Sequence, residues 1–219
     1  MTSVAPLTSD EIESGRKLFA GEWNFVAGAG GPASLPPMRG VEISFAGRSN
    51  VGKSSLVNAL SGRRALARVS DTPGRTREIN FFAGGNELVL VDLPGYGYAR
   101  AGREKIAAWT GLIEAYLQGR ANLARVFVLI DARHGLKETD AEVLDRLDRV
   151  AVSYAIVLTK TDRLQEAELA ARVEGTLGAI RRRPAAFPAV FPTSSISGAG
   201  LGELRGAIVR VLSERARLD

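Results

Sequence analysis

The segment GRSNVGKS, residues 47–54, restricts the fold of this chain more than any other part of the sequence. The apolar run VEISFAG before it predicts a buried strand, and residues 53–60 after it predict a helix. Glycines and a lysine at this spacing, between a strand and a helix, are typical of a loop that wraps backbone N–H groups around phosphates. We therefore expect an α/β protein with a nucleotide site at this loop.

Strand-like and helix-like segments alternate along the rest of the chain. Further strands are predicted at residues 79–84, 87–92, 125–131, 152–160 and 187–193. Helices are predicted at residues 104–117 and 138–150, from about residue 164, and from residue 201. Apolar strands that alternate with helices indicate a mostly parallel sheet with helices on both faces. Because Gly84, Gly85 and Asn86 favour a hairpin, we expect a six-stranded sheet with one antiparallel edge strand, in a three-layer α/β fold.

The N-terminal part carries helix-start signals of its own. Thr8 and Glu11 have the spacing of a capping box, and Leu7 and Ile12 that of a hydrophobic staple. The Gly- and Pro-rich stretch at residues 27–40 cannot hold a helix or a central strand. We therefore expect an N-terminal helix and connector over residues 1–38 and the main domain over residues 39–219.

Composition limits the setting and the partners. The chain has no cysteine, so it cannot form a disulfide or a thiolate metal site. Its polar N-terminus and the lack of an apolar run of about 18 residues predict a cytoplasmic protein without a membrane partner. The net charge of +5, with arginines clustered at residues 63–64, 68–77 and 181–183, suits a polyanionic partner or simply a soluble surface.

Within residues 47–54, Lys53 is placed to reach the β- and γ-phosphates and Ser54 to ligate Mg²⁺. The turn DLPG follows an apolar strand, and there Asp92 would hold the Mg²⁺ through water while Gly95 offers its N–H to the γ-phosphate. By itself such a sequence is usually an ordinary turn. Here it follows a phosphate loop and a neighbouring strand, which favours a role in nucleotide binding.

The segment TKTD, which begins at Thr159, indicates a guanine site. The carboxylate of Asp162 can accept two hydrogen bonds from the N1–H and the exocyclic amine of guanine, a donor pair that adenine lacks. The Lys160 stem can lie against the base. Many guanine sites have asparagine where this chain has Thr159, and TSSISGAG at residues 193–200 would add backbone donors for the guanine carbonyl.

The segment SDTPGRTRE, residues 70–78, has the glycine, proline and threonine content of a loop that senses a γ-phosphate. Thr76 is the preferred second protein ligand for Mg²⁺. Thr72 is its rival, and the sequence does not exclude it.

In this order the motifs resemble those of the EngB ribosome-biogenesis GTPases, within the Era-like group of small GTPases. The resemblance rests on FAGRSNVGKSSLVNAL, TPGRTREINFF, VDLPGYGYAR, DARHGLKETD, TKTD and TSSISGAGL, and it extends from about residue 24 to the C-terminus. It implies a P-loop GTPase fold, Mg²⁺-dependent binding of GTP and GDP, and assistance to assembly of the large ribosomal subunit, from rRNA and ribosomal proteins. It also implies a link to cell division and septation.

The resemblance further implies which residues form the site. Lys53, Thr76 and Asn50 are the candidate catalytic residues, and Ser54, Thr76 and, through water, Asp92 are the candidate Mg²⁺ ligands. The residues expected to bind the nucleotide are Gly47, Arg48, Ser49, Asn50, Val51, Gly52, Lys53, Ser54, Gly74, Arg75, Thr76, Arg77, Glu78, Asp92, Leu93, Pro94, Gly95, Thr159, Lys160, Thr161, Asp162, Thr193, Ser194 and Ser195.

Tyr96 stands where many GTPases keep a glutamine that positions water, so slow hydrolysis is expected. In related GTPases an asparagine at the position of Asn50 helps to hold K⁺ against the phosphates, where the ion stabilises developing charge as an arginine finger does. The alternatives are that Asn50 only braces the loop and that a ribosomal partner supplies the missing group. His134, the only histidine, is expected to be a contact residue more than a general base.

Two other functions fit parts of this pattern. An ATP-using phosphotransferase would share the phosphate loop, but Asp162 argues against it. A non-catalytic RNA- or protein-binding module that uses GTP as a ligand is favoured by Tyr96 and opposed by Lys53, Ser54 and Asp92. Nothing in the sequence indicates an obligate dimer, so we expect a monomer.

Overall fold

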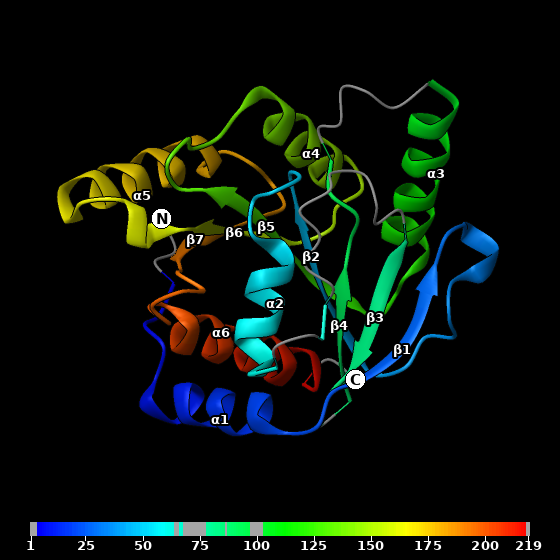
Figure 1. The fold of residues 1–219 in the computed structure, drawn as a ribbon, viewed down its shortest axis with the longest axis horizontal. Helices are drawn as coiled ribbons and strands as arrows, with labels where there is room; N and C mark the ends of the chain where they lie inside the picture. Colours follow the sequence, from blue (N-terminus) through cyan, green and yellow to red (C-terminus); the bar gives the residue numbers. More distant parts are fainter. Residues whose placement is uncertain (1–3, 64–65, 68–77, 86, 97–102, 218–219) are drawn as a thin grey trace.

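A seven-stranded sheet with helices on both faces forms the protein (Figure 1). The computed structural model describes residues 4–63, 66–67, 78–85, 87–96 and 103–217, without the side chains of residues 103–109. The strands are β1 (Asn24–Ala29), β2 (Val41–Gly47), β3 (Ile79–Ala83), β4 (Leu88–Asp92), β5 (Leu123–Asp131), β6 (Tyr154–Thr159) and β7 (Ala186–Pro192).

The strands lie in the order β1-β3-β4-β2-β5-β6-β7. The five strands from β4 to β7 run parallel to one another, and β3 is antiparallel to both of its neighbours, β1 and β4. The expected three-layer, mostly parallel α/β fold is confirmed, but the sheet has one strand more than the six expected. That strand is β1, which pairs with β3 and so moves the hairpin away from the edge of the sheet.

The helices form two layers. The first contains α1 (Ser9–Ala20), α2 (Lys53–Ser61) and α6 (Leu201–Arg215), and the second α3 (Arg103–Gly119), α4 (Glu138–Arg149) and α5 (Glu166–Ile180), with short 3₁₀ turns η1 (Pro32–Ser34) and η2 (Thr161–Arg163) in the connections. None of the helices in these described ranges is both long and apolar enough to cross a membrane.

Alternate residues of the central strands supply the two cores. In β5, Phe127 and Leu129 pack with α1, α2 and α6, whereas Val126 and Val128 pack with α3, α4 and α5. Because every second side chain of a strand points to the same face, a strand covered on both faces must be apolar throughout. This burial explains why the strands at the centre of the sheet read as continuous apolar runs in the sequence.

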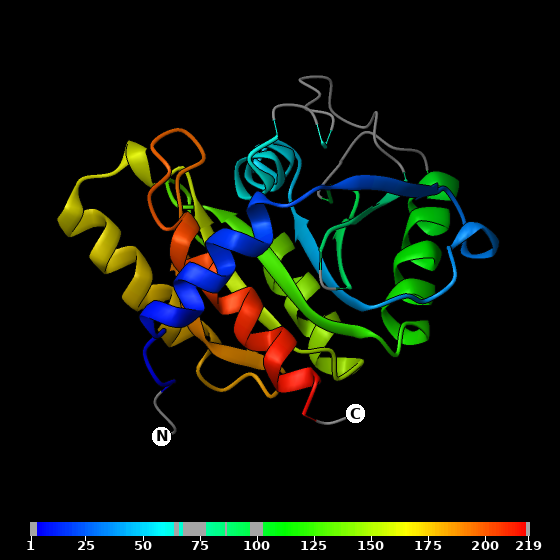
Figure 2. The same cartoon turned by 90° about the horizontal axis from the view of Figure 1, so that it is seen from below.

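Helix α1 packs against α6: the two are neighbours in Figure 1 and cross each other in Figure 2. The predicted capping box is present, since the Thr8 N–H donates to Glu11 Oε2 over 2.8 Å and the Glu11 N–H donates to Thr8 Oγ1 over 3.2 Å. A Cβ built on Gly15 would lie 2.7 Å from the Arg205 carbonyl carbon, so this glycine allows the two helices to approach closely.

Both edge strands have irregular backbones. In β1 the register with β3 shifts between Phe25 and Ala27, as in a β-bulge. Strand β7 contains Pro188 and Pro192, neither of which has an N–H to donate. An edge strand tolerates these features because only one of its sides must pair with a neighbour.

Candidate nucleotide site

The carboxyl ends of the parallel strands meet at one edge of the sheet and bring most of the predicted site residues together. Phe45 in β2 is in register with Asp92 in β4, and Asp131 in β5 is in register with Thr159 in β6. Ligands of open α/β sheets bind at this edge. The fold therefore places the phosphate loop, the DLPG turn and the TKTD segment around a common point.

The phosphate loop leads from the end of β2 into the first turn of α2. Asn50 and Gly52 have positive φ angles of 64° and 100°. A Cβ on Gly47 would lie 2.8 Å from Val51 Cγ1, so the tight turn requires glycine there. Gly52 is the N-cap residue of α2 and has no side chain that could accept a hydrogen bond from the helix. The N–H groups of the first helical turn therefore receive no cap from this residue.

The half-buried Lys53 and the buried Asp92 form an ion pair where the phosphate loop meets the end of β4. Asp92 ends β4, and Ser54 is half-buried in the first turn of α2. A hydroxyl and a carboxylate are the oxygen donors that Mg²⁺ prefers, so the donor set fits this ion. Within the described residues no group of three or more His, Cys, Asp and Glu side chains forms a metal cluster.

Residues at the end of β6 hold the phosphate loop. Thr159 Oγ1 donates to the Val51 carbonyl over 2.7 Å, and Lys160 Nζ donates to the Asn50 carbonyl over 2.7 Å. The Lys160 stem passes beside Gly52, because a Cβ there would lie 3.7 Å from Lys160 Cε. Thr159 thus braces the loop through its hydroxyl, at the position where the sequence pattern raised the question of a missing asparagine.

Asp131 anchors the same lysine from β5. Its carboxylate lies 3.0 Å from Lys160 Nζ and accepts hydrogen bonds from Arg133. Burial alone would raise the pKa of Asp131, but the bonds from Arg133 and Lys160 hold this pKa below its usual range. The carboxylate therefore stays charged and fixes Lys160, whose backbone is left-handed with φ of 58°.

The predicted guanine-binding segments are joined by hydrogen bonds. Ser194 Oγ donates to Asp162 Oδ1 over 2.6 Å and accepts from the N–H groups of Ile196 and Ser197. The Thr161 N–H donates to the Thr193 carbonyl over 3.2 Å. These bonds fix the orientation of the Asp162 carboxylate relative to the loop that begins at Thr193.

Tyr96 packs inward, one of the two outcomes open to a phenol at this position. Its ring is buried, and its hydroxyl donates to Asp140 Oδ1 over 2.9 Å. Burial and the neighbouring Asp140 carboxylate raise the pKa of Tyr96 well above its ordinary value. The hydroxyl therefore remains protonated and is engaged with Asp140.

Asp140, like Asp131, is a residue of this site to which the sequence assigned no role. It is fully buried at the start of α4 and also accepts from Arg48 Nε over 3.1 Å. The motif DARHGLKETD contains both Asp131 and Asp140, so the signal was present in the sequence. Their partners, however, lie on other segments of the chain, and spacing within one motif cannot reveal them.

Several predicted residues lie elsewhere or outside the described ranges. Thr72, Gly74, Arg75, Thr76 and Arg77 are outside the described residues. Glu78 is exposed, and its carboxylate lies beside Gly28 of β1. The exposed His134 belongs to the turn after β5, where its N–H donates to the Asp131 carbonyl.

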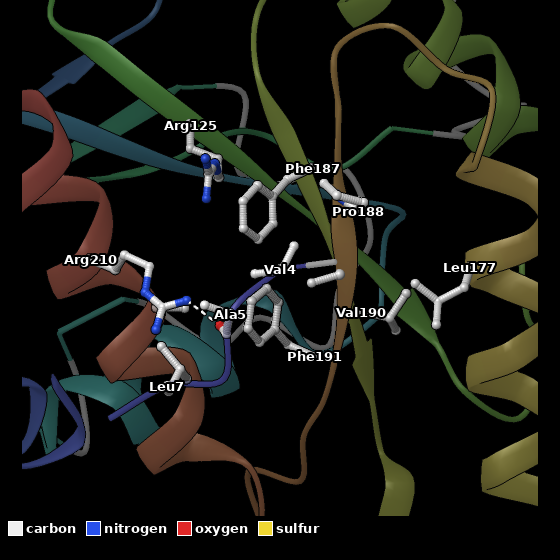
Figure 3. A pocket seen from close by; sticks show the side chains of 12 residues that line it. Val4, Ala5, Leu7, Arg125, Leu177, Phe187, Pro188, Val190, Phe191 and Arg210 are labelled. Atoms are coloured by element: carbon white, nitrogen blue, oxygen red, sulfur yellow. Dashed lines mark hydrogen bonds between the residues drawn. The ribbon is translucent and has the colours of Figure 1, made fainter. Parts of the chain in front are cut away.

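A separate cavity of about 400 Å³ lies between the N-terminal segment, β7 and α6 (Figure 3). Its lining is mostly apolar and contains none of the predicted site residues. Arg210 in this lining donates to Glu11 and to the carbonyls of Ala5 and Pro6, and the Arg125 guanidinium stacks on Phe187, 4.0 Å from the ring centre. Arg210 thus fastens the N-terminal segment to α6, whereas Arg125 packs on β7.

Comparisons with known proteins agree with this geometry. A family model described as 50S ribosome-binding GTPase matches residues 42–160, from β2 to the residue after β6. A relative named "Probable GTP-binding protein EngB" from Rhodopseudomonas palustris (strain TIE-1) is 61% identical over 208 residues, which are 94% of this chain and 96% of the relative.

A relative of the same name from Bradyrhizobium diazoefficiens (strain USDA 110) is 59% identical over 207 residues, 94% of this chain and 95% of its own length. Among solved structures, a crystal structure of a probable GTP-binding protein engB superposes with a TM-score of 0.60 and 25% identity. It covers 80% of this chain and 100% of that one. The region matched by the family model, residues 42–160, includes the phosphate loop, the DLPG turn and the start of the TKTD segment.

Proposed function

The chain belongs to the EngB family of GTP-binding proteins, which are P-loop GTPases, and from this membership we propose that it is a slow, Mg²⁺-dependent GTP switch. In this proposal it assists assembly of the large ribosomal subunit in the cytoplasm, as a monomer, and is needed for normal cell division and septation. One observation supports the proposed nucleotide binding. Thr159 and Lys160 are hydrogen-bonded to the phosphate loop, and Asp162 is hydrogen-bonded to Ser194.

Guanine recognition is proposed for Asp162. Its Oδ1 accepts from Ser194, which leaves lone pairs on the carboxylate for the N1–H and the amine of guanine. Lys160 is held at both ends, by its left-handed backbone and by Asn50 and Asp131, so its stem offers a fixed surface for one face of the base.

Phosphate and metal binding are proposed for Lys53, Ser54 and Asp92. In the phosphate-bound form Lys53 would exchange its contact with Asp92 for the β- and γ-phosphates, and Asp92 would face the metal through water. Bound Mg²⁺ would supply charge neutralisation at the phosphates, with Thr76 or its rival Thr72 as the further protein ligand. The hydroxyl of Ser54 and the carboxylate of Asp92 both offer oxygen atoms, the ligand atoms that Mg²⁺ prefers.

Slow hydrolysis is proposed because the residue after Gly95 does not offer a water-positioning group. The Tyr96 hydroxyl is engaged with Asp140, and its ring is buried. Stabilisation of the developing charge would then come from K⁺ held with the help of Asn50, or from a group of the ribosomal partner. The same observation favours a second candidate, a GTP-dependent binding module without catalysis, and a measured turnover number separates the two.

The nucleotide assignment is tested by Asp162→Asn. An amide at this position presents a donor as well as an acceptor, so the variant should lose affinity for GTP and gain affinity for xanthosine triphosphate. The loss is expected to be about tenfold or more, since a buried polar group of the base is left without its partner. Titrations with GTP, XTP and ATP measure it, with Asp145→Asn on the exposed side of α4 as the matched control. An unaltered preference for GTP would contradict the assignment.

A further inference from the structure

Asp140 joins three segments of the chain through one carboxylate. It accepts from Arg48 in the phosphate loop, from the Tyr96 hydroxyl after β4, and through Oδ2 from the Lys137 N–H over 2.9 Å. The carboxylate is fully buried, and a buried charge is costly unless it is paired and hydrogen-bonded. Loss of any of the three donors would leave the buried carboxylate less well paired, so the cluster is stabilised as a unit. Through it, α4 is bonded to the phosphate loop.

The backbone of Tyr96 is docked on the phosphate loop as well. Its N–H donates to the Gly47 carbonyl over 3.2 Å, and its carbonyl accepts from the Ser49 N–H over 3.2 Å. A Cβ built on Gly95 would lie 3.0 Å from Ser49 Oγ. Residues 92–96 thus lie directly against the first part of the loop.

This docking bears on the terminal phosphate of a nucleotide. Lys53 is expected to contact the β-phosphate of either nucleotide, so it does not distinguish them, whereas the Gly95 N–H is expected to contact only a γ-phosphate. In the docked arrangement Gly95 packs against Ser49 and is followed by the backbone bonds of Tyr96 to the loop, so turning its N–H toward a γ-phosphate disturbs these contacts. A diphosphate makes no contact with Gly95 and can bind with Tyr96 still docked. Contacts that exist only in the docked form therefore favour the diphosphate.

We propose that Asp140 is a positioning residue that acts through Tyr96 and Arg48: it keeps residues 92–96 docked on the phosphate loop and thereby lowers the affinity for GTP relative to GDP. The inference rests on the proposed GTP switch. It explains why this chain has a tyrosine after Gly95, because a phenol is long enough to reach a carboxylate on α4 and an amide side chain is shorter.

The chain offers a matched control for this proposal. Tyr116 on α3 is also buried and donates its hydroxyl to a buried carboxylate, Glu42, over 3.0 Å. Glu42 is paired with Arg120, as Asp140 is with Arg48. This second Tyr–carboxylate–Arg cluster contains no residue of the predicted nucleotide site. Tyr96→Phe and Tyr116→Phe therefore remove the same kind of bond at the site and away from it.

The experiment is a titration of Tyr96→Phe, Tyr116→Phe and the unaltered protein with GDP and a non-hydrolysable GTP analogue. For Tyr96→Phe we expect the ratio of analogue affinity to GDP affinity to rise about three- to tenfold, the range set by loss of a hydrogen bond to a charged acceptor. For Tyr116→Phe we expect the ratio to stay unchanged. Asp140→Asn, which keeps an acceptor oxygen but removes the charge, should shift the ratio in the same direction.

Equal changes for both nucleotides in Tyr96→Phe, or no change, would overturn the inference, since a merely structural bond weakens the two complexes alike. A ratio that moves as far in Tyr116→Phe would overturn it too. If the unaltered protein binds neither nucleotide, the proposed function itself fails, and that result is distinct from an unchanged ratio in a protein that binds both.

Discussion

Asn50 has a backbone conformation that constrains any test of its side chain. Its φ of 64° lies in the left-handed region, which asparagine tolerates better than most residues other than glycine. Its carbonyl accepts from Lys160, so the backbone helps to hold the loop whatever the amide does. Replacement by alanine would therefore mix loss of the amide with strain in the loop.

We predict that KCl stimulates GTP hydrolysis over NaCl at equal ionic strength, and that Asn50→Gly abolishes the stimulation while GDP affinity is retained. Glycine adopts the left-handed conformation without strain, so this variant removes the amide alone. Single-turnover rates in the two salts measure the effect, with Asn50→Ala to show the added cost of strain. Equal rates of the unaltered protein in KCl and NaCl would exclude K⁺ and leave the partner-supplied group.

Individual residues also show where sequence reasoning reached its limit. The need for glycine at positions 47 and 52 could be predicted because it depends on the local backbone of the loop, whereas phosphate contact by Lys53 stays a prediction. The bond from Thr159 to Val51 spans 108 positions, and that from Tyr96 to Asp140 spans 44. Such contacts depend on which strand ends become neighbours, which a single sequence does not specify.

At the scale of elements, α1 is fixed to α6 by close helix packing. We predict that Gly15→Ala lowers the free energy of unfolding by about 1–3 kcal/mol, because the new methyl group would meet the backbone of Arg205 and Gly206. The control is Gly178→Ala in α5, where nothing lies within 4 Å and the change should stabilise the helix by about 0.5–1 kcal/mol. Urea denaturation of the three proteins measures both, and a Gly15→Ala protein as stable as the unaltered one would refute this packing.

The ion pair between Glu11 and Arg210 adds a pH-dependent part to the same contact. The hydrogen bond from Arg210, opposed by burial, lowers the pKa of Glu11 from 4.5 to about 2. A carboxylate whose pKa is lower in the folded state contributes stability above its unfolded pKa and loses it as the pH falls through the folded value. The contribution of Glu11 should thus be full above pH 4.5 and disappear toward pH 2.

We therefore predict that Glu11→Gln lowers the melting temperature at neutral pH and that the difference shrinks between pH 4.5 and about 2. Glu13→Gln is the control on the same helix, since the exposed pair of Glu13 with Arg16 should contribute little. Melting curves at several pH values measure the difference, and a gap that persists at the acid end would contradict the linkage.

Most elements could be predicted from the sequence because their patterns are strong. The hairpin of β3 and β4, the capping box of α1 and the alternation of strands and helices were all expected and are present. Strand β1 was not expected, since its last three residues are Ala27, Gly28 and Ala29, which have low strand propensity. Its pairing with β3 stabilises it, and that pairing is a tertiary effect.

At the scale of the whole molecule, the net charge of +5 is compatible with the ribosomal partner that we propose from family membership. Part of that charge is already used within the protein. Arg183, one of the clustered arginines, donates to Asp145 and Asp148 and holds the end of α5 against α4. The neighbouring Arg182 is exposed, and it is the better candidate for contact with a phosphate backbone.

We predict that binding to large ribosomal subunits is tighter with a GTP analogue than with GDP and falls steeply between about 50 and about 200 mM salt. Arg182→Gln should weaken binding without loss of stability, whereas Arg183→Gln should lower the melting temperature through its two aspartate contacts. Sedimentation with purified subunits measures the first and melting curves the second. Equal binding with the two nucleotides would show that the protein is no switch at the ribosome.

The two irregular edge strands affect the tendency of the protein to aggregate at high concentration. An unpaired strand edge invites another sheet to add to it, which leads to edge-to-edge aggregation. In β1 the register shift falls at the exposed Phe25 and Val26, so the most adhesive part of that edge cannot continue a regular ladder. In β7 the two prolines remove donors from the opposite edge. Both edges of the sheet are therefore poor templates for a further strand, which disfavours edge-to-edge aggregation at high protein concentration.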